Sequence, residues 1–179
     1  HATRYALPPG TRSKTWLLEG DRDEVDDALG LRRARAATLL MLALPGSTYM
    51  YQGEELGLPE VYDLPVEVLD DPVWTRSGHT EKGRDGCRVP IPWSDDGPSA
   101  GFGSVEPWLP QPPGWGAFAA ASNTDPSSTP DLYRRALALR RLHMMNDEDL
   151  EWLDLGGDVV AFRRGSGVAC VVNMSTSEV

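Results

Sequence analysis

A short string rich in arginine offers the clearest candidate chemistry in the sequence. RDGCR, residues 84–88, places two guanidinium groups around one carboxylate, directly before VPIPW. Guanidinium groups suit forked recognition of carboxylates or sugar hydroxyls, and the two prolines hold the backbone behind Arg88 extended. Spacing alone leaves two interpretations open, a recognition site and a surface salt bridge. Trp93 has two options as well, a stacking platform for a sugar or plain packing, and packing is favoured.

Two adjacent acids, Glu54 and Glu55, form the second candidate. Paired carboxylates commonly carry out acid–base or nucleophilic work on a glycosidic bond. Neighbouring side chains diverge on any regular element, however, so adjacency does not set the separation that this chemistry needs. We therefore expect a structural role for the two acids, as an ion pair or a hydrogen bond at a helix start.

Other chemistry has no support in the sequence. The histidines and cysteines, at His1, His79, His143, Cys87 and Cys170, match no tetrahedral metal spacing. Neither His79 nor His143 has the partner set of a catalytic triad, so nucleophilic serine catalysis is not expected. The GxGxxG and P-loop patterns are absent, so nucleotide binding is not expected. We predict no metal site and no cofactor, and we interpret both cysteines as reduced thiols of a cytoplasmic protein.

A helix and a strand must position the paired acids. Apolar residues recur at helical spacing over Leu29–Leu44, after the acidic stretch Asp21–Asp27 and before the helix-stopping Pro45-Gly46. The β-branched and aromatic run Ser47–Gly53 predicts a short buried strand. Helix, break and strand together form the αβ unit of a parallel-sheet or barrel protein, in which function lies just past the strand's carboxyl end.

The later part of the chain divides into an irregular segment, a helix and strands. Residues 58–130 show little periodicity but hold four of the six tryptophans, so we expect this segment to be ordered and packed. A helix is predicted over Asp131–His143, started by Thr129-Pro130. Its apolar stripe consists of Leu132, Ala136, Leu139 and Leu142. The runs EWLDL, VVAFRR and VACVVN, separated by glycine-rich turns, predict the start of a small antiparallel β-domain.

Composition excludes several classes of protein. The chain has 179 residues, with 17 Lys plus Arg against 27 Asp plus Glu and a formal net charge of -10. This acidic balance argues against nucleic-acid and anionic-membrane partners, because binding phosphate requires clustered basic residues. With 40% hydrophobic and 25% charged residues, the composition is typical of a soluble globular protein.

Three strings resemble one family. HATRYALP at the start of the chain, LLMLALPGSTYMYQGEELGLPEV at Leu39–Val61 and DPVWTRSGHTEKGRDGCRVPIPW at Asp71–Trp93 are similar to alpha-glucosidases of the alpha-amylase superfamily. The similar branch is that of oligo-1,6-glucosidases and trehalulose synthases, in its actinobacterial form. The resemblance implies an α/β fold, the C-terminal part of a (β/α)8 TIM barrel over residues 1–146 with an expanded loop at 58–130. The start of an antiparallel β-domain would follow at residues 147–179.

The same resemblance implies an enzyme. The parent protein is expected to be a glycoside hydrolase that releases terminal glucose from short alpha-linked gluco-oligosaccharides by a retaining double displacement. Its catalytic aspartate, glutamate and stabilising aspartate are expected before His1, so no catalytic residue is assigned within this chain and the isolated chain is expected to be inactive. The implied partners are the oligosaccharide and the remainder of the barrel.

Site residues follow from the resemblance position by position. Arg88 matches a motif arginine that contacts the glucosyl unit and pairs with an acid earlier in the sequence, although the motif here departs at three of its positions, Val89, Ile91 and Pro92. Tyr51, Gln52 and Glu54 match the end of the last barrel strand and are expected to form the wall or support of the site. A sugar-isomerising or glucosyl-transferring enzyme similar to trehalulose synthase, and an inactive isolated fragment, are the alternatives.

Overall fold

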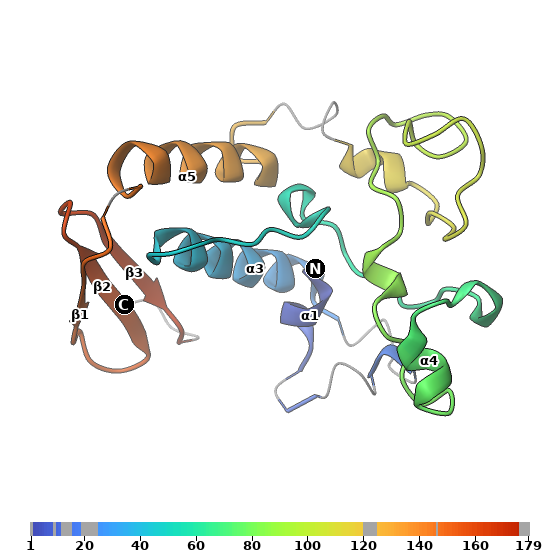
Figure 1. Ribbon diagram of the computed structural model, residues 1–179, viewed down its shortest axis with the longest axis horizontal. Helices are drawn as coiled ribbons and strands as arrows, with labels where there is room; N and C mark the ends of the chain where they lie inside the picture. The colour runs from blue at the N-terminus through green and yellow to red at the C-terminus, as the bar shows by residue number, and fades with distance from the viewer. Residues whose placement is uncertain are drawn as a thin grey trace. The chain divides into compact units, whose positions relative to one another are not determined.

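The chain folds into two compact units (Figure 1). The computed structural model describes residues 2–8, 10–11, 16–18, 25–119, 125–145 and 147–175. The first unit comprises His1–Ala34 and Met50–Pro130, and the second comprises Arg35–Tyr49 and Asp131–Val179. None of the helices in the described ranges has the length and apolar character that crossing a bilayer requires.

Most elements are short, and the two long helices lie far apart in the sequence. The helices are α1 (Thr3–Ala6), α3 (Asp27–Ala43), α4 (Pro72–Arg76) and α5 (Thr129–His143). Four 3-10 helices interrupt the irregular segment and its approach, at η2 (Glu54–Leu56), η3 (Val66–Val68), η4 (Asp85–Cys87) and η5 (Trp115–Phe118). The strands β1 (Leu150–Leu153), β2 (Val159–Arg164) and β3 (Ala169–Asn173) come last.

Helix α3 confirms the predicted helix and its two end signals. The Asp26 carboxylate accepts the N–H of Leu29 at 2.8 Å, and Asp27 stands in the first turn, where a negative charge is favourable. The helix ends before Pro45-Gly46, and Gly46 has a φ of 86°. Residues 21–24 of the predicted acidic start lie outside the described residues.

Two arginines from later parts of the chain cap the carboxyl end of α3. Arg140 of α5 donates to the main-chain oxygens of Leu42, Leu44 and Gly46. Arg164 of β2 is only 2% exposed and donates to the main-chain oxygen of Ala43 at 2.7 Å. The last carbonyls of a helix have no partner within the helix, and a cation there also complements the helix dipole. This double cap fastens α5 and the sheet to α3.

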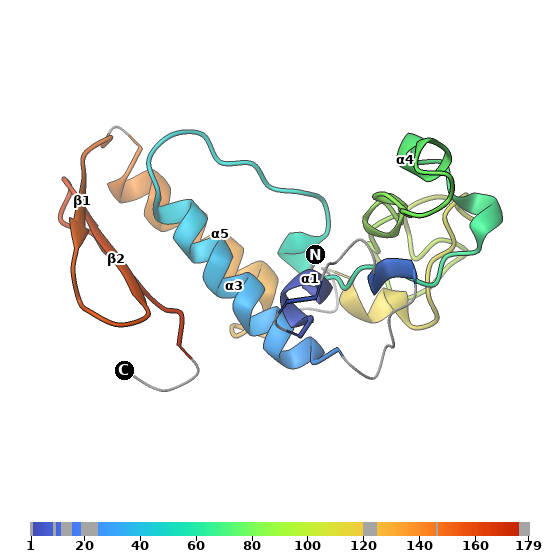
Figure 2. The ribbon, with the colours of Figure 1, turned by 90° about the horizontal axis from the view of Figure 1, so that it is seen from below.

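Helices α3 and α5 lie side by side and run in the same direction (Figures 1 and 2). Thr38 and Tyr133 share a buried hydroxyl–hydroxyl hydrogen bond of 2.9 Å, and one to two turns later Arg140 reaches Leu42. Successive contacts therefore involve higher residue numbers on both helices, so the two helices run parallel. Parallel neighbouring helices are the arrangement that successive βα units produce.

The face that α5 buries differs from the predicted apolar stripe. Tyr133 and Ala136 are buried, whereas Leu139 is exposed and Leu142 is 75% exposed. The tyrosine hydroxyl and the Arg140 guanidinium both find their partners on α3, and this sets the rotation of α5. Polar anchoring thus overrides the hydrophobic pattern at the end of this helix.

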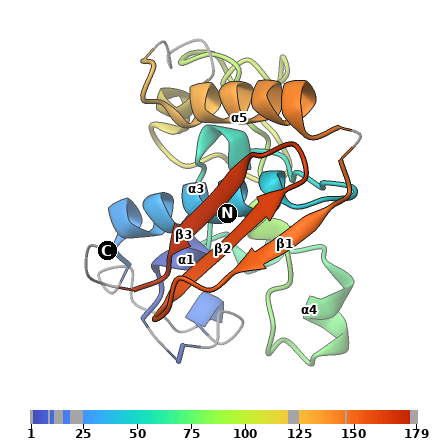
Figure 3. The same ribbon diagram turned by 90° about the vertical axis from the view of Figure 1, so that its left-hand side faces the viewer.

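The three strands form the predicted antiparallel sheet in the order β1-β2-β3 (Figure 3). The register pairs Trp152 with Phe162 and Phe162 with Cys170. Phe162 is fully buried and meets the Trp152 ring edge-on at a centroid distance of 5.5 Å. Glycines with positive φ, Gly156 among them, make the turns, as their conformational freedom allows.

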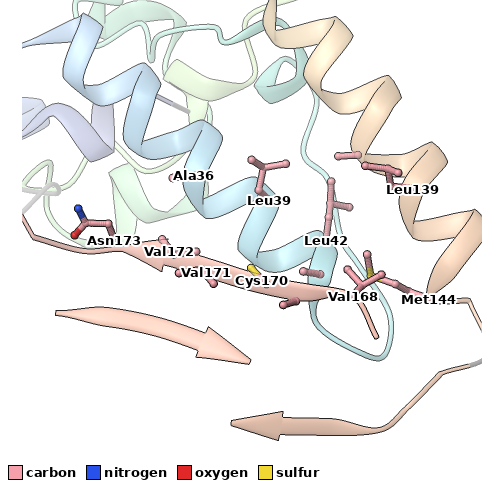
Figure 4. Close-up of a pocket in the computed structure, with 13 residues that line it drawn as sticks. Ala36, Leu39, Leu42, Leu139, Met144, Val168, Cys170, Val171, Val172 and Asn173 are labelled. Carbon is pink, nitrogen blue, oxygen red and sulfur yellow. The ribbon is translucent and has the colours of Figure 1, made fainter. Parts of the chain in front are cut away.

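An apolar cavity of about 380 Å³ lies between α3, α5 and β3 (Figure 4). Leu42, Leu139, Val168 and Cys170 are among the residues that line it, and its one amide side chain is Asn173. Burial raises the pKa of the Cys170 thiol. Sugar recognition requires several polar groups that converge on one point, and this largely apolar lining does not provide them.

The irregular segment is packed around a core of its own. Six buried residues form this cluster: Leu56, Leu58, Val61, Leu64, Val89 and Trp115. The predicted packing of the segment is confirmed for Trp115, whereas Trp93 is 56% exposed. Packing was the favoured role for Trp93, and for this residue the prediction is wrong.

The predicted strand within Ser47–Gly53 does not form. These residues carry no strand hydrogen-bond pattern, and Tyr49 and Met50 are exposed. A strand requires a neighbouring strand for its backbone hydrogen bonds, and no segment in the described part of the chain provides one here. The β-branched and aromatic composition suits a strand, but a strand forms only where a neighbouring strand pairs with its backbone.

Substitutions of two neighbouring arginines in β2, Arg163 and Arg164, test the double cap. We predict that Arg164→Met lowers the free energy of unfolding by about 2–4 kcal/mol, because the carbonyl of Ala43, in a buried hydrogen bond, and the carbonyl of Asp149 both lose a charged donor. The matched variant Arg163→Met removes an exposed ion pair with Glu151 and should cost less than about 1 kcal/mol. Chemical denaturation of the complete enzyme measures both, and equal losses would contradict the cap.

Candidate functional site

The turn η4 is built on the buried carboxylate of Asp85. Its Oδ2 accepts the main-chain N–H groups of Asp70 and Asp71, each at 2.8 Å. Its Oδ1 accepts a hydrogen bond of 3.1 Å from Nη1 of Arg88. Asp85 therefore holds the backbone before α4 and the arginine after η4 at the same time.

Asp71 makes the reciprocal contacts and is only 2% exposed. Its Oδ1 caps α4 by accepting the N–H of Val73 at 2.9 Å, with a proline following at the first helical position. Its Oδ2 accepts the N–H of Arg84 at 3.2 Å and lies 3.0 Å from Nη1 of Arg88. The Val73 N–H, and then the Arg84 N–H and the charge of Arg88, hold the pKa of Asp71 below its ordinary value against the effect of burial.

Gly83 is required for this arrangement. It has a φ of 73°, and a Cβ added there would lie 2.6 Å from Cγ of Asp71. Only glycine combines that backbone conformation with such a close approach. The turn can therefore close over the buried carboxylate.

Arg88 lies where the two carboxylates converge. One nitrogen, Nη1, contacts both Asp71 and Asp85, while the side chain as a whole is 35% exposed. Burial acts to lower the pKa of Arg88, but the hydrogen bond with Asp85, the charge of Asp71 and a hydrogen bond with Tyr51 outweigh it and raise the pKa. The guanidinium is thus firmly charged, fixed at one nitrogen and still accessible.

The string that follows Arg88 is anchored as its prolines predict. Val89 is buried in the core cluster of the segment. The main-chain oxygen of Pro90 accepts hydrogen bonds of 2.9 Å from the Gln111 amide and from the Trp115 indole. Arg88 therefore projects from a stiff support.

The other predicted site residues lie on the segment that leads into η2. Tyr51 contacts Arg88, and burial, followed by the nearby Cys87 thiol, raises the pKa of its hydroxyl. Gln52 is exposed. Glu54 opens η2, as expected of an acid at a helix start. Its Oε1, however, is buried without a hydrogen-bond partner among the described residues.

Sequence reasoning missed Asp71, the residue with the most contacts in this cluster. A local signal was present, because Asp71-Pro72 is a cap and first-turn pair. Nothing in the spacing showed that the same carboxylate reaches an arginine 17 positions later. Within the described ranges no three histidine, cysteine or acidic side chains converge as a metal site requires.

Residues 17–148 match the family model of the alpha-amylase catalytic domain. The chain belongs to the alpha-amylase family. It is similar to a probable alpha-glucosidase of Rhizobium meliloti, with 37% identity over 147 residues that cover 79% of this chain and 26% of that protein. An oligo-1,6-glucosidase of Parageobacillus thermoglucosidasius is 29% identical over 136 residues, 66% of this chain and 24% of that protein.

A solved structure agrees with this membership of the alpha-amylase family. The alpha-glucosyl transfer enzyme XgtA is 38% identical, with a TM-score of 0.62 over 73% of this chain and 24% of that one. The predicted fold class is confirmed as the C-terminal part of a (β/α)8 barrel followed by the start of an antiparallel β-domain. The chain spans about a quarter of the length of these curated relatives.

Lowering the pH tests whether its neighbours hold the Asp71 carboxylate in the ionised form. In the unfolded chain this carboxylate takes up a proton near its ordinary pKa of 3.8, whereas in the folded chain it stays ionised to lower pH. Its contribution to stability is therefore fully present above the ordinary pKa and is lost as the pH falls through the folded-state pKa. We predict that the unfolding free-energy difference between wild type and Asp71→Asn is constant above about pH 5 and shrinks below about pH 4.

Denaturation curves of the complete enzyme recorded at a series of pH values measure this difference. A difference that does not change with pH would show that Asp71 is not held ionised by its neighbours.

Proposed function

We propose that the chain is part of a cytoplasmic alpha-glucosidase that removes terminal glucose from short alpha-linked gluco-oligosaccharides. In the retaining mechanism an aspartate attacks the anomeric carbon while a glutamic acid protonates the leaving oxygen, and water then releases glucose from the glucosyl-enzyme. These carboxylates are expected in the remainder of the barrel. The proposed division of this chain is barrel over residues 1–146 and β-domain over 147–179.

One observation carries the proposal, the clamped but accessible guanidinium of Arg88. Two buried carboxylates contact its Nη1, and 35% of the side chain remains exposed. A sugar hydroxyl is a hydrogen-bond acceptor as well as a donor, and a fixed guanidinium supplies donors in a planar fork. Binding to a preorganised donor avoids the entropy of ordering a free arginine, so the clamp favours ligand recognition.

Three residues near η2 support Arg88 in this proposal. Tyr51 contacts the guanidinium and forms the nearest part of the site wall. Gln52 is exposed and contributes a polar amide to that wall. Glu54 offers a buried oxygen that no described group satisfies, and a donor from the rest of the barrel or from the sugar would satisfy it.

Glucosyl transfer or sugar isomerisation is the second candidate. It is supported by the 38% identity with the glucosyl transfer enzyme XgtA, whereas the altered residues beside Arg88, Val89, Ile91 and Pro92, favour neither reaction. Hydrolysis and transfer share the glucosyl-enzyme intermediate and differ in the acceptor that attacks it. Product analysis on maltose and sucrose separates the two.

Removing the guanidinium tests the proposed function in the complete enzyme. We predict that Arg88→Ala lowers kcat/KM on a chromogenic alpha-glucoside by about 10²-fold, the effect of losing one well-placed charged contact. Arg76→Ala is the matched control, because Arg76 is exposed and bonds only to the Pro72 main chain among the contacts described for it. Near wild-type turnover of the Arg88 variant would refute the assignment.

The isolated chain provides a second test. We predict that these 179 residues alone release no glucose from maltose and do not melt cooperatively, because the extended segment at 47–52 lacks a pairing strand in the described structure. Size-exclusion chromatography and thermal melting measure this. A monodisperse chain with one sharp transition would contradict the prediction.

A further inference from the structure

An ion pair with one buried member, Glu60, joins helix α1 to the segment just after η2. Nε and Nη2 of Arg4 contact the two carboxylate oxygens of Glu60 at 2.6 and 2.7 Å, in a forked geometry. The main-chain N–H of Glu60 donates to Oγ1 of Thr3 at 2.8 Å, and the N–H of Ala2 donates to the carbonyl of Leu58. Glu60 is only 3% exposed. A buried carboxylate in a forked, charge-assisted pair of hydrogen bonds is held firmly by its arginine partner.

The residue after Glu60 touches the turn that carries Arg88. The N–H of Val61 donates to the carbonyl of Gly86 at 3.0 Å. A Cβ added to Gly86 would lie 2.2 Å from the carbonyl oxygen of Val61, so the two backbones are in direct contact. Gly86 is the middle residue of η4, and the N–H of Arg88 in turn donates to the carbonyl of Asp85 at 2.9 Å.

Electrostatics also shows that the ion pair lies beside this turn. Burial is the main cause that raises the pKa of the Cys87 thiol, the negative charge of Glu60 adds to it, and Arg4 offsets part of the increase. Cys87 directly precedes Arg88. Both members of the pair therefore act on the residue next to the guanidinium.

We infer that Glu60 is a positioning residue for Arg88. Its ion pair with Arg4 fixes the segment 60–61 against α1, and the contact between Val61 and Gly86 transmits that position to η4 and to Arg88. The clamp by Asp71 and Asp85 sets how the guanidinium is held within the segment, and the Arg4–Glu60 pair sets where the clamp lies relative to α1. This inference rests on the proposed function, in which Arg88 contacts the glucosyl unit.

A double-mutant cycle in the complete enzyme separates positioning from general stability. We predict that Glu60→Gln lowers kcat/KM on a chromogenic alpha-glucoside about 10- to 100-fold, the effect expected from a small misplacement of a binding group. In an Arg88→Ala background the same substitution should change kcat/KM less than about twofold, because Glu60 acts through a side chain that is gone. The matched control is Glu151→Gln, which breaks an exposed pair with Arg163 of the same 2.6 Å length and should leave kcat/KM unchanged.

Each outcome of the double-mutant cycle either supports or overturns the positioning role of Glu60. A full additional loss in the Arg88→Ala background, or no loss from Glu60→Gln in the wild-type background, overturns the positioning role while leaving the function intact. If Arg88→Ala itself keeps wild-type activity, the proposed function fails and the inference fails with it. Should Glu60→Gln not fold, Arg4→Lys keeps the positive charge, removes the fork and is run through the same cycle with the same expected result.

Discussion

Burying two carboxylates side by side is unfavourable unless donors and a cation compensate them, and the irregular segment of this chain is organised by that requirement. Asp71 and Asp85 each accept main-chain N–H groups from the other's neighbourhood, and both contact Nη1 of Arg88. Removing Arg88 would leave both buried carboxylates without the cation that they share. The backbone before α4 and the backbone of η4 are therefore fixed together, although neither belongs to a long helix or a sheet.

The same principle, charged side chains that satisfy main-chain groups, recurs in the second unit. There the donors are arginines and the acceptors are the carbonyls at the end of α3. In the irregular segment of the first unit, a few charged groups, each satisfied by several partners, replace the ladders of hydrogen bonds that regular elements would supply. This explains how a segment rich in proline and glycine can hold Arg88 still enough to serve in recognition.

Local signals predicted the elements well and the polar contacts poorly. Helix α3, helix α5 and the three strands were predicted from periodicity, capping residues and turn glycines, because those signals act over a few residues. The segment Ser47–Gln52 was wrongly predicted as a strand, since pairing depends on a distant partner. Arg88 was identified as a candidate by its string and by resemblance. Its partner Asp71 and the pair between Arg4 and Glu60, which spans 56 positions, were beyond the reach of local patterns.

The proposed function depends on contact between the clamped guanidinium of Arg88 and the sugar. A crystal structure of the complete enzyme, inactivated at its nucleophile and soaked with maltose, tests this most directly. The account predicts a guanidinium nitrogen of Arg88 within about 2.7–3.2 Å of a hydroxyl of the terminal glucosyl unit, with Nη1 still in contact with Asp71 and Asp85. A bound sugar that lies out of reach of Arg88, or an Arg88 that has left both carboxylates to reach it, would contradict the account.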